Sequence, residues 1–212
     1  MTASTPLSGR RAEAARNDER ILAAARSVFT AQPDAPIAAV AQEAGVGIGA
    51  LYRRFRSKDE LLRRLAHDGL VRYVALVEEA LADEGDAWHA FAGFLQRAVD
   101  TGTSSITARF AGAFPVDDEL RSLGIRADSS TARLLARTRE RGGLRAGIEV
   151  GDVALVLEQL QAVSVGDAPR QLELRHRYLA LALDGMHTSR EVPLPGAAPT
   201  WQEISRRYER PM

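Results

Sequence analysis

The stretch that decides the fold is residues 36–62, PIAAVAQEAGVGIGALYRRFRSKDELL. It holds two short apolar segments, residues 36–44 and 47–55, with Gly45 and Val46 at the corner between them. Pro36 suits the first turn of a helix, because its fixed φ fits there and its missing N–H would have no partner. Gly45 stops that helix, because glycine adopts the positive φ of a tight corner without steric cost. Two short helices around such a corner predict a helix-turn-helix.

The second of these helices is expected to be displayed at the surface. Leu51 and Phe55 stand four residues apart, so both face the core of the small domain. Small residues at the start of the helix allow close approach to DNA, and basic and aromatic residues at its end can reach phosphates. The alternative is two packed helices of a bundle with a solvated charged face. The outward positions are Ile48, Gly49, Tyr52, Arg53 and Arg54.

Longer helices are predicted on both sides of this motif. The preceding helix runs from residue 11 or 17 to residue 31, and Pro33 ends it. The following helix begins at a capping box, in which Ser57 and Glu60 can each accept from an otherwise unpaired backbone N–H. Its apolar stripe continues to about residue 83, which gives a rod of roughly 40 Å. A rod of that length can join two domains.

The rest of the chain also predicts helices, because apolar residues recur at spacings of three and four and strand-like alternation is scarce. Asp86 caps the first of these helices and Gly102 closes it. Further helices are expected over residues 104–114, 118–141 (with a break near residue 128 as one option), 152–165 and 169–185. A Pro/Gly-rich stretch over residues 193–199 precedes a second capping box, Thr200 to Glu203, which opens a short helix. The predicted fold class is all-α.

The chain divides by charge into a basic beginning and an acidic remainder. Its 212 residues carry 28 basic and 28 acidic side chains, but residues 1–64 hold eleven basic against seven acidic ones, a surplus of +4. This asymmetry favours a polyanion-binding domain attached to a second domain of different character, although chance also produces such an asymmetry. We therefore predict an N-terminal arm with a helix-turn-helix DNA-binding domain over residues 1–64, a helical effector-binding and dimerisation domain over residues 65–192, and a tail over residues 193–212.

Composition and motifs disfavour several other function classes. The chain has no Cys, so disulfides, thiolate chemistry and Cys-ligated zinc are excluded. Its four His are scattered, and no Gly-rich phosphate loop is present, so we expect no catalytic residues, no metal and no cofactor. No apolar run reaches the roughly 20 residues of a membrane helix, so we expect a cytoplasmic protein without a membrane partner.

The run from residue 40 to residue 62 resembles the tetracycline-repressor (TetR/AcrR) family of bacterial transcriptional regulators. The specific likeness covers residues 21–65, and the remainder agrees in length, in helix content and in the approach through Gly143, Leu144 and Arg145 to Asp152. The resemblance implies a homodimer whose C-terminal domain binds a small molecule, with repression as the usual mode of action. The implied partners are double-stranded operator DNA, a small-molecule effector and a second copy of the chain.

The resemblance also assigns roles at the DNA surface. Tyr52, Arg54 (usually His) and Lys58 would contact phosphates, while residues around Gly47, Ile48, Ala50 and Arg53 would read bases. The N-terminal arginines can add contacts to phosphates or to the minor groove, as basic arms do. The complete candidate set for DNA binding is Gly47, Ile48, Gly49, Ala50, Tyr52, Arg53, Arg54, Lys58, Arg10, Arg11 and Arg16.

Three positions depart from the family pattern. Pro36 stands where Thr usually caps the second helix and touches phosphate, Gly47 replaces a common Ser, and Ala50 replaces Thr. Base-specific hydrogen bonds from the displayed helix are therefore expected to be few. Arg53 on a guanine, with Ile48 or Ala50 against thymine methyl groups, would supply the readout.

Apolar residues near the C-terminus are candidates for a dimer interface. The helices over residues 152–165 and 169–185 carry more apolar residues than one face can bury, so two copies could form a four-helix bundle. The alternative is that these helices simply form the core of the monomer. The candidate interface residues are Val153, Val156, Leu157, Leu160, Leu179 and Leu183.

A cluster of aromatic residues lies between the helix-turn-helix and the helices that are candidates for the dimer interface. This cluster is the candidate ligand site. It can line a cavity with a few polar anchors, or it can be core, and for any single aromatic residue the core interpretation is favoured. The candidates are Trp88, Phe91, Phe94, Gln96, Arg109, Phe110, Phe114 and Arg133.

The long helix that begins at the first capping box, Ser57 to Glu60, supplies a route by which ligand binding is coupled to DNA binding. A ligand that prefers a conformer in which this helix pivots would change the spacing of the recognition helices and weaken DNA binding. Two other classes stay open: an enzyme, and a helical small-molecule carrier without operator binding. Turnover without DNA would favour the enzyme, and ligand binding without a DNA shift would favour the carrier.

Overall fold

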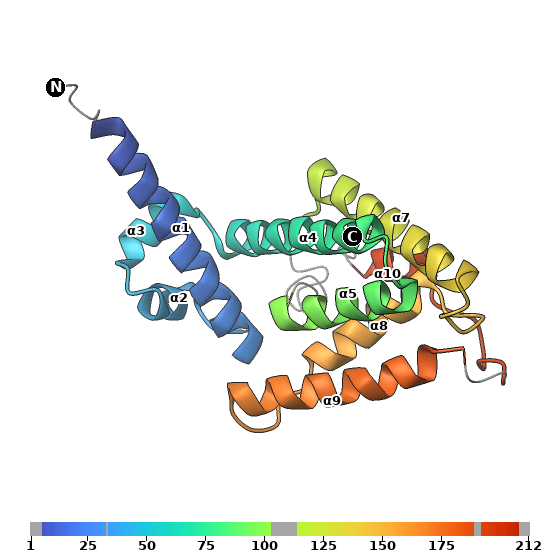
Figure 1. Ribbon diagram of the computed structural model, residues 1–212. Coiled ribbons are helices and arrows are strands. Elements are labelled where there is room, and N and C mark those ends of the chain that lie inside the picture. Colours follow the sequence, from blue (N-terminus) through green and yellow to red (C-terminus); the bar gives the residue numbers. More distant parts are fainter. Residues whose placement is uncertain (1–5, 33, 103–113, 189–191, 208–212) are drawn as a thin grey trace. The chain divides into compact units, whose positions relative to one another are not determined.

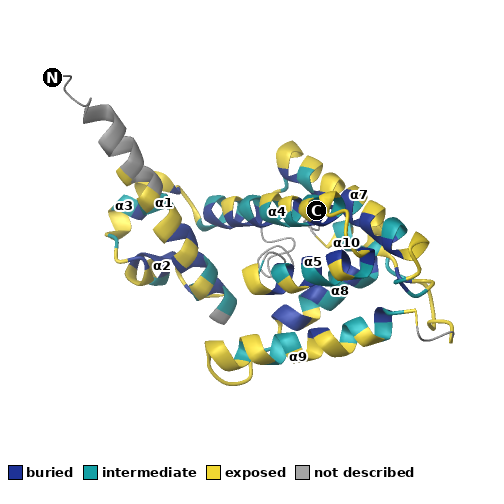
Figure 2. Ribbon diagram, in the orientation of Figure 1, coloured by how far each residue is buried: buried dark blue, intermediate teal, exposed yellow. Residues whose placement is uncertain are grey.

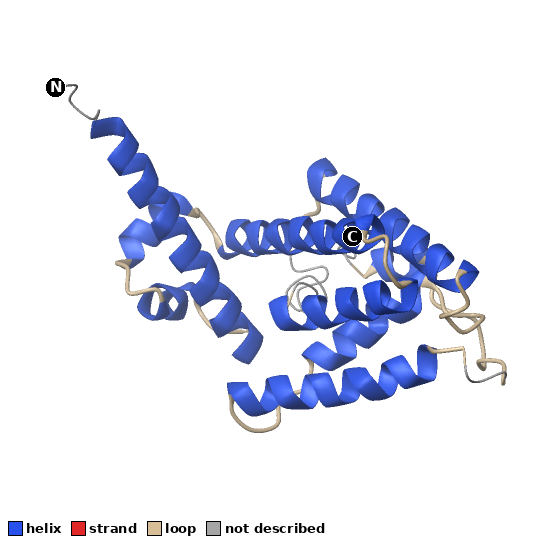
Figure 3. Ribbon diagram, in the orientation of Figure 1, coloured by secondary structure: helices blue, strands red, loops and turns tan. Residues whose placement is uncertain are grey.

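The computed structural model describes residues 6–32, 34–102, 114–188 and 192–207. Over these residues every regular element is an α-helix (Figures 1 and 3), and the one strand-like feature is an isolated antiparallel bridge between Leu144 and His187. The predicted all-α fold class is confirmed. Among the described helices, none is long and apolar enough to cross a membrane. The chain divides into two compact units, Met1–Leu65 and Ala66–Met212.

The first unit consists of three helices and the beginning of a fourth. α1 (Pro6–Ala31) starts earlier than predicted, α2 (Ile37–Glu43) and α3 (Ile48–Arg54) follow, and α4 (Lys58–Ala82) begins within this unit. α1 packs against α2, and α2 packs against α3. The apolar stripe of each helix is buried (Figure 2), and the resulting core includes Ile21, Leu22, Ala25, Phe29, Val40, Ala41, Leu51, Phe55, Leu61 and Leu62.

α4 starts at the predicted cap. Ser57 Oγ accepts a hydrogen bond from the backbone N–H of Glu60 at 3.1 Å. The Glu60 carboxylate accepts from the N–H of Arg56 at 2.7 Å, one residue before the cap. Two donors at the start of the helix are thereby satisfied. α4 then continues as one helix across the boundary between the two units.

The second unit is built around α5 (Ala87–Thr101). Asp86 caps its start, and Gly102 ends it with φ +59°. α5 contacts α7 (Asp118–Glu140), α8 (Val150–Gln161) and α9 (Ala168–Met186). A single core joins these helices to α4, and its buried residues include Val77, Phe91, Phe94, Leu95, Val99, Leu134, Leu135, Val153, Leu157, Leu160 and Leu179.

One helix of this unit, α8, differs from the prediction, and another, α7, decides an option that the prediction left open. α7 has no break, and Thr131 in its middle is buried with its hydroxyl donating to the Ala127 carbonyl at 2.7 Å, so its polarity is satisfied inside the helix. α8 ends at Gln161, because the N–H of Ala162 bonds to two carbonyls of the preceding turn and tightens it. The helix predicted over residues 104–114 lies outside the described residues, except for its last position.

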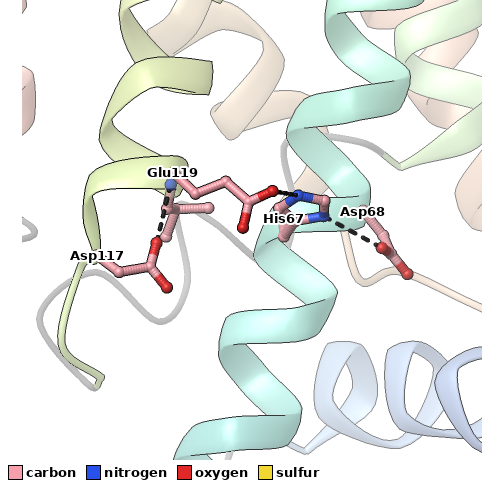
Figure 4. Close-up of polar contacts among 5 residues, drawn as sticks. His67, Asp68, Asp117 and Glu119 are labelled. Carbon is pink, nitrogen blue, oxygen red and sulfur yellow. Dashed lines mark hydrogen bonds and ion pairs between the residues drawn. The ribbon is translucent and has the colours of Figure 1, made fainter.

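Polar contacts join α4 to α7 within the second unit. His67 Nε2 lies 3.1 Å from Glu119 Oε1, and the other ring nitrogen of His67 lies 3.5 Å from Asp68 Oδ1 (Figure 4). Further along both helices, the Arg126 guanidinium donates two hydrogen bonds of 2.9 Å to the Glu78 carboxylate. These pairs align the two helices along their length.

The end of α4 is capped from α7. Arg137 Nη1 donates to the carbonyls of Leu81 and Asp83, each at 2.9 Å. These carbonyls belong to the helix end, where no further turn supplies donors. α4 is therefore fixed to α7 at its last turn as well as along its side.

Candidate DNA-binding helix and ligand pocket

A Schellman-type turn joins α2 to α3. Gly45 has φ +63°, and its N–H donates to the Gln42 carbonyl at 3.1 Å. The N–H of Val46 donates to the Ala41 carbonyl at 3.0 Å. This pair of bonds satisfies the last carbonyls of α2 and turns the chain sharply into α3. The corner that the sequence predicts is thus built from backbone hydrogen bonds.

Arg20 of α1 closes over this turn. Its Nη2 donates to the Ala44 carbonyl at 2.7 Å. The position requires a positive φ, and a Cβ on Gly45 would lie 3.1 Å from the same nitrogen, so the end of the Arg20 side chain would have to shift slightly. The sequence reveals the glycine, but not the arginine that packs on it, because the two are far apart in the chain.

α3 buries one face and exposes the other. Leu51 is 0% exposed and Phe55 is 6% exposed, whereas Ile48 is 43% and Tyr52 is 47% exposed. No described atom lies within 4 Å of the place where a Cβ on Gly47 would stand. The start of the helix therefore leaves its backbone accessible. The exposed candidates are Gly47, Ile48, Gly49, Tyr52, Arg53 and Arg54, and Ala50 is half-buried.

Arg54 is paired with Asp18 of α1. Its Nε donates to Asp18 Oδ1 at 2.6 Å, and its Nη2 forms an ion pair with the other carboxylate oxygen. The hydrogen bond that Arg54 donates to Asp18 raises the pKa of Arg54 above its ordinary value. The charge that the resemblance assigns to a DNA phosphate is thus shared with a carboxylate of the same unit.

Lys58 is also engaged within the unit. Its Nζ donates to the Ala35 carbonyl at 3.0 Å and lies 4.9 Å from the centroid of the Phe29 ring. The side chain is half-buried and connects the start of α4 to the segment before α2. Of the predicted arm residues, Arg16 is exposed on α1, while the side chains of Arg10 and Arg11 lie outside the described part.

A pocket of about 520 Å³ lies in the second unit, among α4, α7, α8 and α10 (Trp201–Arg206). That volume is typical of a site for a drug-sized molecule. The lining is mostly apolar, with four charged side chains. Its apolar and aromatic residues include Leu70, Tyr73, Phe114, Val116, Leu120, Ile125, Val150, Leu155, Trp201 and Ile204, and its charged residues are Arg121, Asp128, Glu158 and Arg207.

The wall formed by α4 and α7 contains a short hydrogen-bonded chain. Tyr73 Oη lies 3.0 Å from Thr131 Oγ1, and the Thr131 hydroxyl donates to the Ala127 carbonyl. Because the Thr131 proton is used there, Tyr73 is the donor of the first bond. Burial raises the pKa of Tyr73 to about 12, so the phenol stays protonated. Beside this chain, burial raises the pKa of Asp128 above its ordinary value.

The C-terminal tail supplies another wall of the pocket. Thr200 and Glu203 form the predicted capping box at the start of α10, with each side chain accepting from the other's backbone N–H. Arg207 donates two hydrogen bonds to the Glu158 carboxylate of α8, at 2.9 and 2.6 Å. The sequence predicts this short helix but not its place over the pocket.

Two glycines make room for the tail. A Cβ on Gly151 of α8 would lie 2.0 Å from the Pro199 carbonyl oxygen. A Cβ on Gly124 of α7 would lie 3.0 Å from the ring of Trp201. Gly124, inside the helix predicted over residues 118–141, was the available signal that another segment packs there, whereas Gly151 lies just before the helix predicted over residues 152–165.

Most of the predicted ligand residues do not line this pocket. Phe114 does, whereas Phe91 and Phe94 are 0% exposed in the core. Trp88 packs at the edge of that core and stacks edge-on with His187. Periodicity reports that a helix face is buried, but it does not distinguish a filled core from a cavity wall. Gln96 and Arg133 are exposed and away from the pocket, and Arg109 and Phe110 lie outside the described residues.

Four of the predicted interface residues belong to the core of the monomer. These are Val153, Leu157, Leu160 and Leu179, while Val156 and Leu183 are only partly buried against the core. They point inward because α8 and α9 pack on α5 and on each other. The outer side of α9 exposes other apolar residues instead, with Tyr178 50% and Leu181 59% exposed.

Comparisons with known proteins agree with this architecture. Residues 21–65 match the family described as bacterial regulatory proteins of the tetR family, and residues 86–188 match the C-terminal domain of SbtR-like transcriptional regulators. The TetR transcriptional regulator SCO0520 from Streptomyces coelicolor is 27% identical, with a TM-score of 0.57 over 82% of this chain and 99% of that one. No curated protein matches the chain.

Two mycobacterial structures are similar as well. A TetR transcription regulatory protein from Mycobacterium vanbaalenii is 25% identical, with a TM-score of 0.55 over 84% of this chain and 99% of that one. LfrR from Mycobacterium smegmatis, in complex with proflavine, shares the fold at 22% identity, with a TM-score of 0.56 over 85% of this chain and 99% of that one.

Proposed function

Because this chain belongs to the TetR family of bacterial regulatory proteins, we propose that it is a homodimeric repressor released from its operator by a small molecule. Membership makes it a DNA-binding transcriptional regulator, and we expect no catalytic turnover. The observation that carries the proposal is α3, a short helix fixed by a backbone-bonded turn, with Leu51 buried and most of its other positions exposed.

α3 is proposed to enter the major groove of operator DNA. Gly47 and Gly49 leave the start of the helix bare, so its backbone can approach the DNA closely. Arg53 is exposed and has the reach for a bidentate contact with guanine, and Ile48 can contact a thymine methyl group. Tyr52 and the flanking cations would position the helix on phosphates.

The dimer is proposed to form through the outer face of α9. Tyr178, Leu181 and Gly185 follow one another at helical spacing, so they share a face, and no described atom lies within 4 Å of the position of a Cβ on Gly185. A bare glycine beside two exposed apolar side chains allows two helices to approach closely. Two copies of α8 and α9 would then form a four-helix bundle around a twofold axis.

The effector is proposed to bind in the pocket under α10. Both Leu70 and Tyr73 of α4 line it, and α4 is one continuous helix that starts in the first unit. A ligand that fits better when α4 shifts against α7 would therefore favour a different state of the DNA-binding unit, and DNA would weaken ligand binding equally. LfrR, which shares the fold, forms a complex with proflavine.

Selection of bound fragments from a genomic DNA library with the full-length protein tests the proposed function. We expect inverted repeats, and we expect Arg53→Ala to bind with relaxed specificity, losing about 1–3 kcal/mol of discrimination at one base pair of each half-site. Arg141→Ala, which removes an exposed charge at the end of α7, is the matched control. Recovery of no common sequence, or equal specificity of both variants, would contradict the assignment.

A further inference from the structure

We propose that the pocket under α10 takes an apolar organic cation whose protonated nitrogen lies against the Asp128 carboxylate. Its role as the effector site rests on the function proposed above, but the choice of ligand class does not. Three observations support this ligand class. They are the pairing of the charged side chains around the pocket, the use of the Tyr73 and Thr131 protons within one wall, and the aromatic side chains of the remaining lining.

The charges around the pocket are not equivalent. Glu158 and Arg207 neutralise each other through two hydrogen bonds. Asp128 is half-buried, and the structure records no hydrogen bond or ion pair for it among the described residues. Arg121 is exposed and keeps its water. Of the two remaining charges, Asp128 has the larger desolvation cost, because it is partly removed from water and Arg121 is not. A cationic ligand therefore offsets more of this cost than an anionic ligand offsets at Arg121.

The wall beside Asp128 offers acceptors rather than donors. The Tyr73 proton goes to Thr131, and the Thr131 proton goes to a backbone carbonyl. The phenol oxygen keeps a lone pair, and the neighbouring carboxylate supplies further acceptor sites. Burial raises the pKa of Asp128, which is consistent with a carboxylate that lacks a compensating charge. A ligand group that carries N–H donors complements the oxygens of Tyr73 and Asp128, whereas a carboxylate placed beside these two oxygens would meet only acceptors.

Aromatic side chains surround the same space. Phe114, Tyr73 and Trp201 all line the pocket, from three different segments of the chain. Aromatic faces attract cations and also pack against flat apolar ligands. The geometry therefore favours a ligand with an aromatic or aliphatic body and a single protonated amine.

Three probes of one shape test this ligand class: 1-naphthylmethylamine, 1-naphthylmethanol and 1-naphthoate. Calorimetric titration of the full-length protein near neutral pH is expected to show the amine binding about tenfold more tightly than the alcohol, with the carboxylate weakest. Tightest binding by the carboxylate would overturn the proposal. So would the absence of binding by all three probes at millimolar concentration.

A pair of variants assigns the preference to one side chain. Asp128→Asn should retain binding of the alcohol but reduce the ratio of amine to alcohol affinity to about one. Asp118→Asn, which removes an equal charge from the first turn of α7 outside the pocket, should leave that ratio unchanged. An unchanged ratio in Asp128→Asn would overturn the assignment.

A DNA readout separates this inference from the proposed function. If the amine binds through Asp128 and also releases DNA, both stand. If it binds through Asp128 while DNA affinity is unchanged, the ligand class stands and the effector role of the pocket fails. The calorimetric result does not depend on operator binding, so the two failures are distinguishable.

Discussion

Arg54 carries a charge that is paired within its own unit and that we propose also contacts DNA. In the free protein its guanidinium holds the Asp18 carboxylate with two of its nitrogens, which braces α3 against α1. The side chains are partly exposed to water, so the pair contributes little to stability. Its larger expected effect is on the surface that we propose faces DNA, where each subunit would offer one less uncompensated positive charge.

Neutralising Asp18 should therefore strengthen DNA binding. In Asp18→Asn, Arg54 is free for phosphate, and we expect higher affinity for all sequences, with a log–log salt slope steeper by about two per dimer. Fluorescence anisotropy over a series of salt concentrations measures both quantities. Glu19→Gln, which removes an exposed neighbouring charge on the same helix, is the control for general electrostatics. Equal slopes in the two variants would show that Arg54 does not reach the DNA.

Asp128 should cost the unliganded protein stability. Its pKa is raised by burial, so the folded state binds the proton more tightly than the unfolded state does. Stability therefore falls as the pH rises from the unfolded pKa to the folded one, and the loss is complete above the folded pKa. We expect Asp128→Asn to melt at a higher temperature than the wild type near pH 7, and the difference to vanish below about pH 4. Asp118→Asn is the control, and a lower melting temperature for Asp128→Asn at neutral pH would contradict the account.

At the scale of elements, the short C-terminal helix α10 packs onto the second unit and forms part of its pocket. Its capping box fixes its start, and the Arg207–Glu158 pair fixes its end to α8. Between these points Trp201 and Ile204 form part of the pocket wall. The tail is thus a structural component of the pocket that we propose as the ligand site.

Adding one methyl group to α8 should displace this tail. In Gly151→Ala the new Cβ would lie 2.0 Å from the Pro199 carbonyl oxygen, so the chain there must move. We expect faster proteolysis of the C-terminal segment and a red shift of tryptophan fluorescence as Trp201 gains water. Gly93→Ala, whose Cβ would meet only the end of the Arg97 side chain at 3.5 Å, should instead gain up to about 1 kcal/mol from helix propensity. Identical proteolysis of both variants would show that the tail does not rest on α8.

Elements with strong local signals were predictable from the sequence. The corner at Gly45, the caps at Ser57, Asp86 and Thr200, and the inward pair on α3 all follow from rules that involve nearby residues. The ligand pocket was not predictable in the same way. Phe91 and Phe94 have the same periodicity whether they line a cavity or fill a core, and the place of the tail depends on contacts between distant segments.

At the scale of the whole molecule, the proposed regulator depends on an association of two chains. The sequence predicted an excess of apolar residues on the last two long helices, but Val153 and Leu157 are used by the core of the monomer. Tyr178 and Leu181 are left on the outer face of α9. Counting apolar residues predicted a second surface on these helices, and the packed structure shows which apolar residues the core leaves exposed.

A charge on this outer face should separate the dimer. We expect Leu181→Glu to raise the dimer dissociation constant about a hundredfold or more, because two buried carboxylates would lack partners. Light scattering after size-exclusion chromatography measures the mass, and DNA affinity should fall with it. Ala180→Glu, exposed on another side of the same helix, should remain dimeric. A Leu181→Glu protein with the mass and DNA affinity of the wild type would exclude α9 as the interface.

The central claim is that two copies of α3 enter successive major grooves of one DNA molecule. The most direct test measures the affinity of the full-length protein for its selected inverted repeat and for a version with about five base pairs added between the half-sites, which rotates one half-site by half a helical turn. The account predicts tight binding to the first and a loss of about a hundredfold or more for the second, because only one α3 can then bind. Equal affinity for both spacings would contradict it.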